Sequence, residues 1–203
     1  MGSGAQTLFP LFLKLAGRPV LLVGGGPVAT AKAKALAEAG AIVTIVSPEL
    51  TAELDGLFAE NGRRNGWRVH RRAFERVDLE GAWLVIAAAP PAVNRAVAEA
   101  AEERCVFVVA VDDPPSASAY GAGVVRRAGV TIALSTDGKA PALAGLLREG
   151  VEALLPDDLD AWVAEATRLR PVWRAEKVPM ADRRPSLLAA LNRLYDARAV
   201  PRG

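Results

Sequence analysis

The stretch PVLLVGGGPVATAKAKALAEAGAIVTIVSP, residues 19–48, decides the fold. Its opening run, PVLLVGGG at 19–26, is apolar and ends on glycines, which is typical of a buried parallel strand entering a tight turn. The alanine-rich segment 27–40 ends at Gly40 and predicts a helix. Residues 41–48 are rich in β-branched side chains and close with Ser47-Pro48, which predicts a second strand. Together they predict one strand–helix–strand unit of about 30 residues.

The alternation of strands and helices continues towards residue 113. We expect a helix within 49–60, strands at 67–74 and 82–89, a helix at 91–104, and a final parallel strand at 106–111 within the apolar run 106–113. Apolar strands that alternate with helices favour a doubly wound parallel sheet, so the predicted fold class is α/β and Rossmann-like.

The composition of the chain changes after Asp113. Residues 114–123 are rich in turn formers, 129–138 predict one more strand and turn, and 140–156 predict an amphipathic helix. Two further helices are expected at about 157–170 and 185–197, separated by the stretch from Pro171 to Pro185. This tail is too small to form a good core alone, so we expect it to pack on the first domain or on another chain.

Composition and charge exclude several functional classes. The chain has 203 residues and a net charge of +2, which is too small an excess to indicate general nucleic-acid binding. Cys105 is the only cysteine, which excludes an intrachain disulfide and any multi-cysteine metal site and suggests a reducing compartment. No apolar run reaches the roughly 18 residues of a membrane span. The sequence predicts a cytoplasmic protein without a membrane or nucleic-acid partner.

The glycine turn predicts a dinucleotide site. Gly24-x-Gly26-x-x-Ala29 fits G-x-G-x-x-G/A, and it follows a strand and opens a helix. The first glycine permits the tight turn, the second lets a pyrophosphate approach the backbone, and the small alanine lets helix and strand pack closely. The exposed amides of the turn, including Gly25, would then face the phosphates.

The end of the second predicted strand bears on the choice of coenzyme. Ser47-Pro48-Glu49 stands where an acidic residue usually holds the ribose, so Glu49 is a candidate ribose partner and Pro48 a candidate for packing on adenine. The alternative is that Glu49 simply begins a helix. Because no arginine follows this strand closely, NAD is favoured over NADP.

Three segments resemble one enzyme family. They are LFPLFLKLAGRPVLLVGGGPVATAKAKALAEAGAIVTIVSP at 8–48, VFVVAVDDPPSAS at 106–118 and TIALSTDGKAPALAGLLREGVEALLP at 131–156. They resemble the precorrin-2 dehydrogenases, which occur alone or as the N-terminal module of siroheme synthase, and the likeness covers about residues 8–156. The combination of GGGxVA, VDxP and the late S-x-x-G-x-x-P-x-L segment is more specific than a lone glycine motif.

The resemblance implies NAD-dependent oxidation of precorrin-2, a tetrapyrrole, to sirohydrochlorin by a homodimer. It implies an NAD-binding domain at 1–113, a dimerisation segment at 114–156 and a small helical domain at 157–203. Pro27 and Val28, with Pro48 and Glu49, match the nucleotide-contacting pairs of the family. Asp112 matches its catalytic aspartate.

Asp112 is also a candidate on chemical grounds. It follows a predicted parallel strand at the end where open α/β sheets place their ligands. Loss of a hydride from a tetrapyrrole must be matched by loss of a proton, which a carboxylate could accept. Asp113 is a lesser candidate. The alternative is that either aspartate only terminates the strand before Pro114.

Candidate substrate-binding residues lie later in the chain. Thr136 and the start of the following helix could bind a substrate carboxylate, although Thr136 could equally cap that helix. Lys139 and Arg126 could meet other carboxylates of the substrate.

No metal ligand is expected. His70 is the only histidine, and it lies among arginines that oppose metal binding. Two other functions stay open: a bifunctional enzyme that also inserts iron into sirohydrochlorin, and a non-catalytic dinucleotide sensor.

Overall fold

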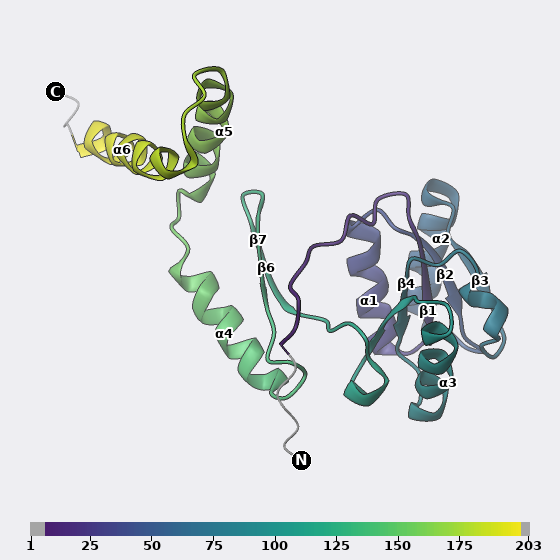
Figure 1. The fold of residues 1–203 in the computed structure, drawn as a ribbon. Helices are drawn as coiled ribbons and strands as arrows, with labels where there is room; N and C mark the ends of the chain where they lie inside the picture. The colour runs from purple at the N-terminus through teal and green to yellow at the C-terminus, as the bar shows by residue number, and fades with distance from the viewer. Residues whose placement is uncertain (1–6, 200–203) are drawn as a thin grey trace, which may run out of the picture. The chain divides into compact units, whose positions relative to one another are not determined.

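The computed structural model describes residues 7–199, with side chains for residues 7–195. The chain divides into two compact units (Figure 1). Of the described residues, the first unit comprises 7–121 together with 137–139, and the second comprises 122–136 together with 140–199.

The first unit is built on a parallel sheet of five strands in the order β3-β2-β1-β4-β5. Its strands are β1 (Pro19–Val23), β2 (Ile42–Val46), β3 (Arg68–His70), β4 (Leu84–Ala87) and β5 (Phe107–Ala110). The helices are α1 (Pro27–Glu38), α2 (Ala52–Asn65) and α3 (Pro91–Glu102), with 3₁₀ turns η1 (Arg76–Leu79) and η2 (Pro114–Ser116). The predicted α/β, doubly wound parallel fold is confirmed.

Helices cover both faces of this sheet. Ala29 and Ala33 of α1 and Leu54 of α2 pack in one apolar cluster, and Val97 and Ala101 of α3 pack in the other. The central strand β1 lies between the two clusters, and its residues 20–23 are at most 2% exposed. Burial on both faces explains why β1 reads as an unbroken apolar run.

The strand order brings several loops together at the carboxyl ends of the central strands. The chain forms β1, β2 and β3 outward in one direction and then crosses to β4 and β5 on the other side of β1. The carboxyl ends of β1 and β4 therefore flank the position where the strand order reverses, which is where open α/β sheets bind their ligands.

The second unit contains a hairpin and three helices. The strands β6 (Gly123–Arg127) and β7 (Val130–Leu134) pair antiparallel, and α4 (Pro141–Leu154) packs against both. The helices α5 (Leu159–Ala175) and α6 (Met180–Ala199) pack together. Between them, Trp162 Nε1 donates a hydrogen bond of 2.7 Å to Tyr195 Oη.

Several predicted boundaries in this unit are wrong. The strand β6 was not expected; its turn to β7 has Ala128 and Gly129 both at positive φ, a conformation for which alanine gives no sequence signal. The predicted break from Pro171 to Pro185 is confined to 176–179, because α5 and α6 run through both prolines. A proline inside a helix removes one hydrogen bond and crowds the carbonyl four residues earlier, yet both helices continue past their prolines while they pack against each other.

Boundaries in the first unit shift less. The strand expected at 67–74 is only three residues long, and the helix expected within 49–60 begins at Ala52 and extends to Asn65. Among the described residues, no helix is both long and apolar enough to cross a bilayer.

Candidate functional site

The three glycines of the turn between β1 and α1 differ in the space that surrounds them. Gly24 has a φ of +122°, and a Cβ there would strike the carbonyl of Ala88. A Cβ on Gly25 would strike the carbonyl of Glu49. A Cβ on Gly26 would meet no atom within 4 Å. Protein packing therefore requires the first two glycines, whereas the third leaves an open approach to the start of α1.

Hydrogen bonds from neighbouring elements hold this turn. Thr51 N–H donates to Gly25 O at 2.9 Å, and Thr30 Oγ1 donates to Gly26 O at 3.0 Å. The two threonine hydroxyls lie 2.8 Å apart. Thr51 also caps α2 by accepting from Leu54 N–H at 3.1 Å. Sequence reasoning missed both threonines, because their roles depend on α1 and α2 lying side by side.

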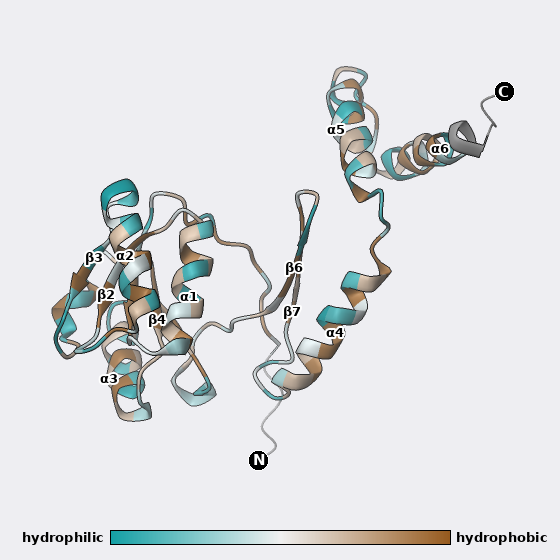
Figure 2. Cartoon of the chain, turned by 180° about the vertical axis from the view of Figure 1, so that it is seen from behind, coloured by the Kyte–Doolittle hydropathy of each residue, from teal (hydrophilic) through white to brown (hydrophobic). Residues whose placement is uncertain are grey.

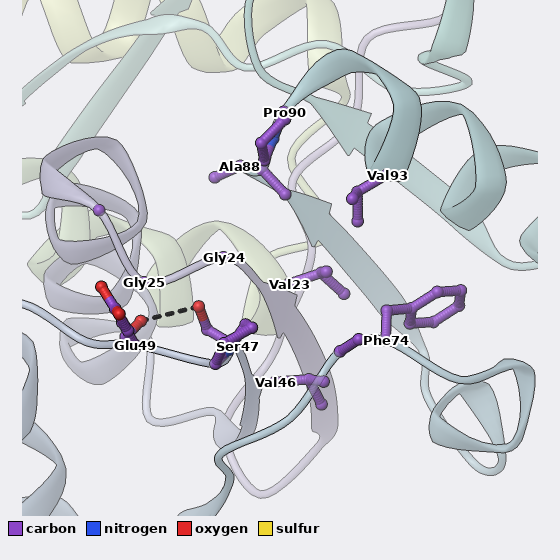
Figure 3. A pocket seen from close by; sticks show the side chains of 14 residues that line it. Val23, Gly24, Gly25, Val46, Ser47, Glu49, Phe74, Ala88, Pro90 and Val93 are labelled. Atoms are coloured by element: carbon purple, nitrogen blue, oxygen red, sulfur yellow. Dashed lines mark hydrogen bonds between the residues drawn. The ribbon is translucent and has the colours of Figure 1, made fainter.

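A cleft of about 580 Å³ opens beside the turn. Gly24, Gly25 and Gly26 line it, together with Ser47, Pro48 and Glu49 from the end of β2. Ser47 Oγ donates to Glu49 O at 2.8 Å and fixes this corner (Figure 3). Figure 3 shows Glu49 beside Gly25, and an apolar wall on the other side of the turn formed by Val23, Val46, Phe74 and Val93.

A smaller cavity of about 210 Å³ adjoins the cleft and shares Ala88 and Ala89 with it. Val28 of α1 and Asp112 and Asp113 of the loop after β5 also line this cavity. Asn94 forms part of the same wall; it is only 2% exposed, and its Oδ1 accepts from Ala89 N–H at 3.0 Å. This asparagine fixes the loop between β4 and α3 and was missed in the sequence.

Asp112 occupies an unusual backbone conformation. Its φ is +56°, and its side chain is exposed. The preceding Val111 N–H donates to Ala87 O at 2.9 Å, which extends the pairing of β5 with β4 up to the aspartate. Non-glycine residues rarely adopt a positive φ, and such conformations concentrate at functional sites.

An ion pair supports the apolar wall of the cleft. Arg72 donates two hydrogen bonds to the carboxylate of Asp78, at 2.8 and 2.6 Å, and Asp78 also accepts from Glu75 N–H at 2.9 Å. Burial raises the pKa of Asp78, but the hydrogen bonds from Arg72 and Glu75 and the charge of Arg72 outweigh it and lower the pKa below its usual value. Ala73 and Phe74, between the partners, line the cleft.

The structure brings together only part of the predicted set. The glycines, Pro48 and Glu49 meet in the cleft, and Val28 and Asp112 meet in the smaller cavity. Pro27 is the first residue of α1 and lines neither.

The predicted substrate-binding residues lie in different units. Lys139 belongs to the first unit, where its Nζ lies 3.7 Å from a carboxylate oxygen of Asp137. Thr136 and Arg126 belong to the second. Thr136 Oγ1 accepts from Ala140 N–H at 3.2 Å. Ala140 is itself the N-cap of α4, and no side chain caps that helix, so Thr136 does not take the capping role that the sequence left open.

His70 lies far from Asp112. It ends β3 at one edge of the sheet, whereas Asp112 follows β5 at the other edge. Four strand spacings separate these edges, roughly 19 Å. Among the described residues, no group of three or more histidines, cysteines, aspartates and glutamates is arranged to hold a metal ion.

The strand order, the glycine turn at its reversal point and the cleft across that turn define a dinucleotide-binding domain of the Rossmann class. Residues 11–122 match the model of the family described as "Putative NAD(P)-binding". The chain belongs to this NAD(P)-binding family.

Known proteins similar to this chain include siroheme synthases. "Siroheme synthase 1" of Aeromonas salmonicida (strain A449) is 44% identical over 176 residues, which are 86% of this chain and 37% of that protein. "Siroheme synthase" of Neisseria meningitidis serogroup C (strain 053442) is 41% identical over 177 residues, 87% of this chain and 36% of that protein. The chain therefore spans little more than a third of the length of these relatives.

A solved structure shares the fold. The protein named "SirC, precorrin-2 dehydrogenase" superposes with a TM-score of 0.70 at 23% identity, over 90% of this chain and 88% of that one. The resemblance to this group of proteins, predicted from the sequence, is confirmed.

Proposed function

We propose that the chain catalyses the NAD-dependent dehydrogenation of precorrin-2 to sirohydrochlorin. The observation that carries the proposal is the meeting of two cavities at Ala88 and Ala89, one along the glycine turn and the other beside Asp112. The similarity to siroheme synthases over 86% of the chain supports the choice of substrate.

The residues fit a dinucleotide across the two cavities. The open side of Gly26 and the start of α1 offer backbone N–H groups and the positive end of a helix dipole to a pyrophosphate. Glu49 can accept hydrogen bonds from a ribose, and the wall formed by Val23, Val46, Phe74 and Val93 suits the adenine ring. The nicotinamide end would then reach the smaller cavity.

In the proposed reaction NAD, when bound, accepts two electrons and one proton as a hydride from the substrate. Asp112 accepts the second proton that the substrate must lose, so the products are sirohydrochlorin, NADH and H⁺. Asp112 can perform this role because its exposed carboxylate lines the smaller cavity. Asn94 and the pairing of Val111 with Ala87 hold the surrounding loops in place.

A spectroscopic assay tests the function directly. Purified chain is mixed with precorrin-2 and NAD, and the absorption of sirohydrochlorin and of NADH is followed under anaerobic conditions. Equal amounts of the two products, formed only in the presence of the chain, support the proposal. Binding of NAD without any formation of sirohydrochlorin would instead favour the dinucleotide sensor.

The preference for NAD over NADP follows from the charges around the cleft. Glu49 would repel a 2′-phosphate, and the nearby Arg71 and Arg72 are held in ion pairs by Asp55 and Asp78. We expect NAD to bind more tightly than NADP in a fluorescence titration. A clear preference for NADP would contradict this assignment.

We also propose that the chain works as a homodimer. Apolar residues lie along α4 (Figure 2). The helix has no buried residue, and Leu143, Leu146 and Leu147 on it are 46–65% exposed, which suits a contact with a second copy. The cytoplasmic location and the insertion of iron stay predictions from the sequence and its family resemblance.

A further inference from the structure

Two opposite sides of helix α1 have different neighbours. On one flank Thr30 hydrogen-bonds Thr51 at the start of α2, and Lys34 pairs with Glu53 of α2 at 2.5 Å. On the other flank lie Val28 and Lys32, which are four residues apart and therefore on the same side of the helix. This second flank faces the part of the unit that holds β5 and the loop after it.

Two observations place Lys32 there. A Cβ built on Gly121 would lie 3.5 Å from Lys32 Nζ and 3.9 Å from a methyl carbon of Val109 on β5. Val28, one helical turn before Lys32, lines the smaller cavity together with Asp112. The ammonium group of Lys32 therefore lies beside Gly121, and its helix carries Val28, which lines the cavity of Asp112, one turn earlier.

Lys32 differs from many other cations of the first unit. Lys34, Arg71, Arg72 and Arg76 each have a carboxylate partner, and Lys139 lies near Asp137. Within residues 7–195, Lys32 makes neither an ion pair nor a hydrogen bond, although its side chain is half-buried. A half-buried ammonium group without an anionic partner is available to a bound anion.

We propose that Lys32 binds a peripheral carboxylate of the tetrapyrrole and so positions the macrocycle at the cavity of Asp112. This assignment rests on the proposed function. A tetrapyrrole is larger than the 210 Å³ cavity and carries its acetate and propionate groups around its rim. A rim carboxylate would therefore lie outside the cavity, about one helical turn from Val28, where Lys32 is placed.

Binding of sirohydrochlorin to the full chain, measured by absorption titration without NAD, tests the role of Lys32 separately from catalysis. Lys32→Met should raise the dissociation constant about 10-fold, as expected when one charge-assisted hydrogen bond is lost. Lys32→Arg should restore most of the affinity. The affinity of the unchanged chain should fall with added salt, and that dependence should be weaker in Lys32→Met.

Lys34→Met is the matched control, because it removes the same charge from the same helix on the flank that faces α2. It should leave the dissociation constant of sirohydrochlorin within 2-fold of that of the unchanged chain. The affinity for NAD should be the same in both variants, which separates loss of a substrate contact from damage to the glycine turn. Turnover of precorrin-2 by Lys32→Met should show a raised KM with little change in kcat.

The outcomes distinguish the two proposals. Weaker sirohydrochlorin binding in Lys32→Met alone supports the role of Lys32, even if the unchanged chain fails to oxidise precorrin-2. Equal binding by the two variants overturns the role of Lys32, even if turnover is normal. Absence of any sirohydrochlorin binding by the unchanged chain overturns it as well.

Discussion

The three consecutive glycines of the turn are held by different constraints. Gly24 combines a φ of +122° with close packing against the backbone of Ala88, and Gly25 packs against the backbone of Glu49. Gly26 has a φ of −79°, which any residue adopts, and open space where a side chain would lie. A requirement for glycine at position 26 would therefore come from a ligand and not from the fold.

This difference predicts opposite behaviour for two alanine variants. Gly26→Ala should change the free energy of unfolding by no more than about 1 kcal/mol and raise the dissociation constant for NAD at least about 10-fold. Gly24→Ala should destabilise the chain by about 2 kcal/mol or more, because the methyl group clashes with Ala88 and the backbone is strained. Chemical denaturation and NAD titration measure the two quantities. Unimpaired NAD binding by Gly26→Ala would contradict the placement of the pyrophosphate.

A substitution at Asp112 can separate the role of its carboxylate from the effect of its positive φ. Asn adopts a positive φ at least as readily as Asp, so Asp112→Asn should keep the loop conformation while removing the carboxylate. We expect kcat for sirohydrochlorin formation to fall about 100-fold or more, with the dissociation constant of NAD nearly unchanged. Asp113→Asn serves as the control and should retain most activity. Full activity of Asp112→Asn would remove the proposed proton acceptor.

At the scale of elements, the segment between β3 and η1 forms one wall of the cleft. The Asp78 side chain is only 4% exposed, and it ties Arg72 to the backbone of Glu75 across Ala73 and Phe74. Arg71, next to it, makes a more exposed pair with Asp55. Exposed ion pairs contribute little to stability, whereas removal of one partner of a buried pair costs more.

Because the pKa of Asp78 is lowered in the folded chain, the stabilisation that its ion pair provides depends on pH. The stabilisation is fully present above the unfolded-state pKa, about 3.8, and is lost as the pH falls through the lower pKa of the folded state. Asp78→Asn should therefore lower the free energy of unfolding by about 1–2 kcal/mol near neutral pH. The difference from the unchanged chain should shrink as the pH falls below 3.8.

Denaturation at several pH values measures this effect, and Asp55→Asn is the control. Because the Arg71–Asp55 pair is about half-exposed on both sides, its loss should change stability by less than about 1 kcal/mol. A constant difference between Asp78→Asn and the unchanged chain down to low pH would show that the carboxylate charge contributes nothing.

At the scale of the whole molecule, the second unit buries little apolar surface of its own. Val125, Leu159, Ala190 and Leu191 are its buried apolar residues within the described part of the chain, whereas Leu154 is 83% exposed. An amphipathic helix needs an apolar surface to cover it, and in the proposed homodimer a second copy of the chain would supply that surface.

The proposed dimer predicts that a charge on α4 dissociates the chain into monomers. Leu146→Asp should raise the dimer dissociation constant at least about 10-fold, because Leu146 is 65% exposed on the proposed interface and its replacement would bury a charge. Val77→Asp introduces the same charge at a 51% exposed position of the first unit and should leave the dimer intact. Light scattering over a range of concentrations measures both. A monomeric unchanged chain would contradict the proposal.

The strand–helix–strand unit and the glycine turn could be predicted because their signals are local. The apolar run of β1, the alanines of α1 and the glycines after Val23 each restrict their own segment of backbone. The hairpin of β6 and β7 could not be predicted as easily, since Ala128 adopts its positive φ only because both strands pair around it. Helix continuation through Pro171 and Pro185 likewise depends on packing.

The sequence by itself determined the class of fold, the position of the nucleotide turn and the candidate aspartate. Tertiary structure alone decided which loops meet: Ala88 against Gly24, Asp112 beside Val28, and Lys32 on the flank of α1 away from α2. The physical reason is that periodicity records which face of an element is buried but not which element buries it. That choice is made by the order of strands in the sheet, which depends on the packing of the whole unit.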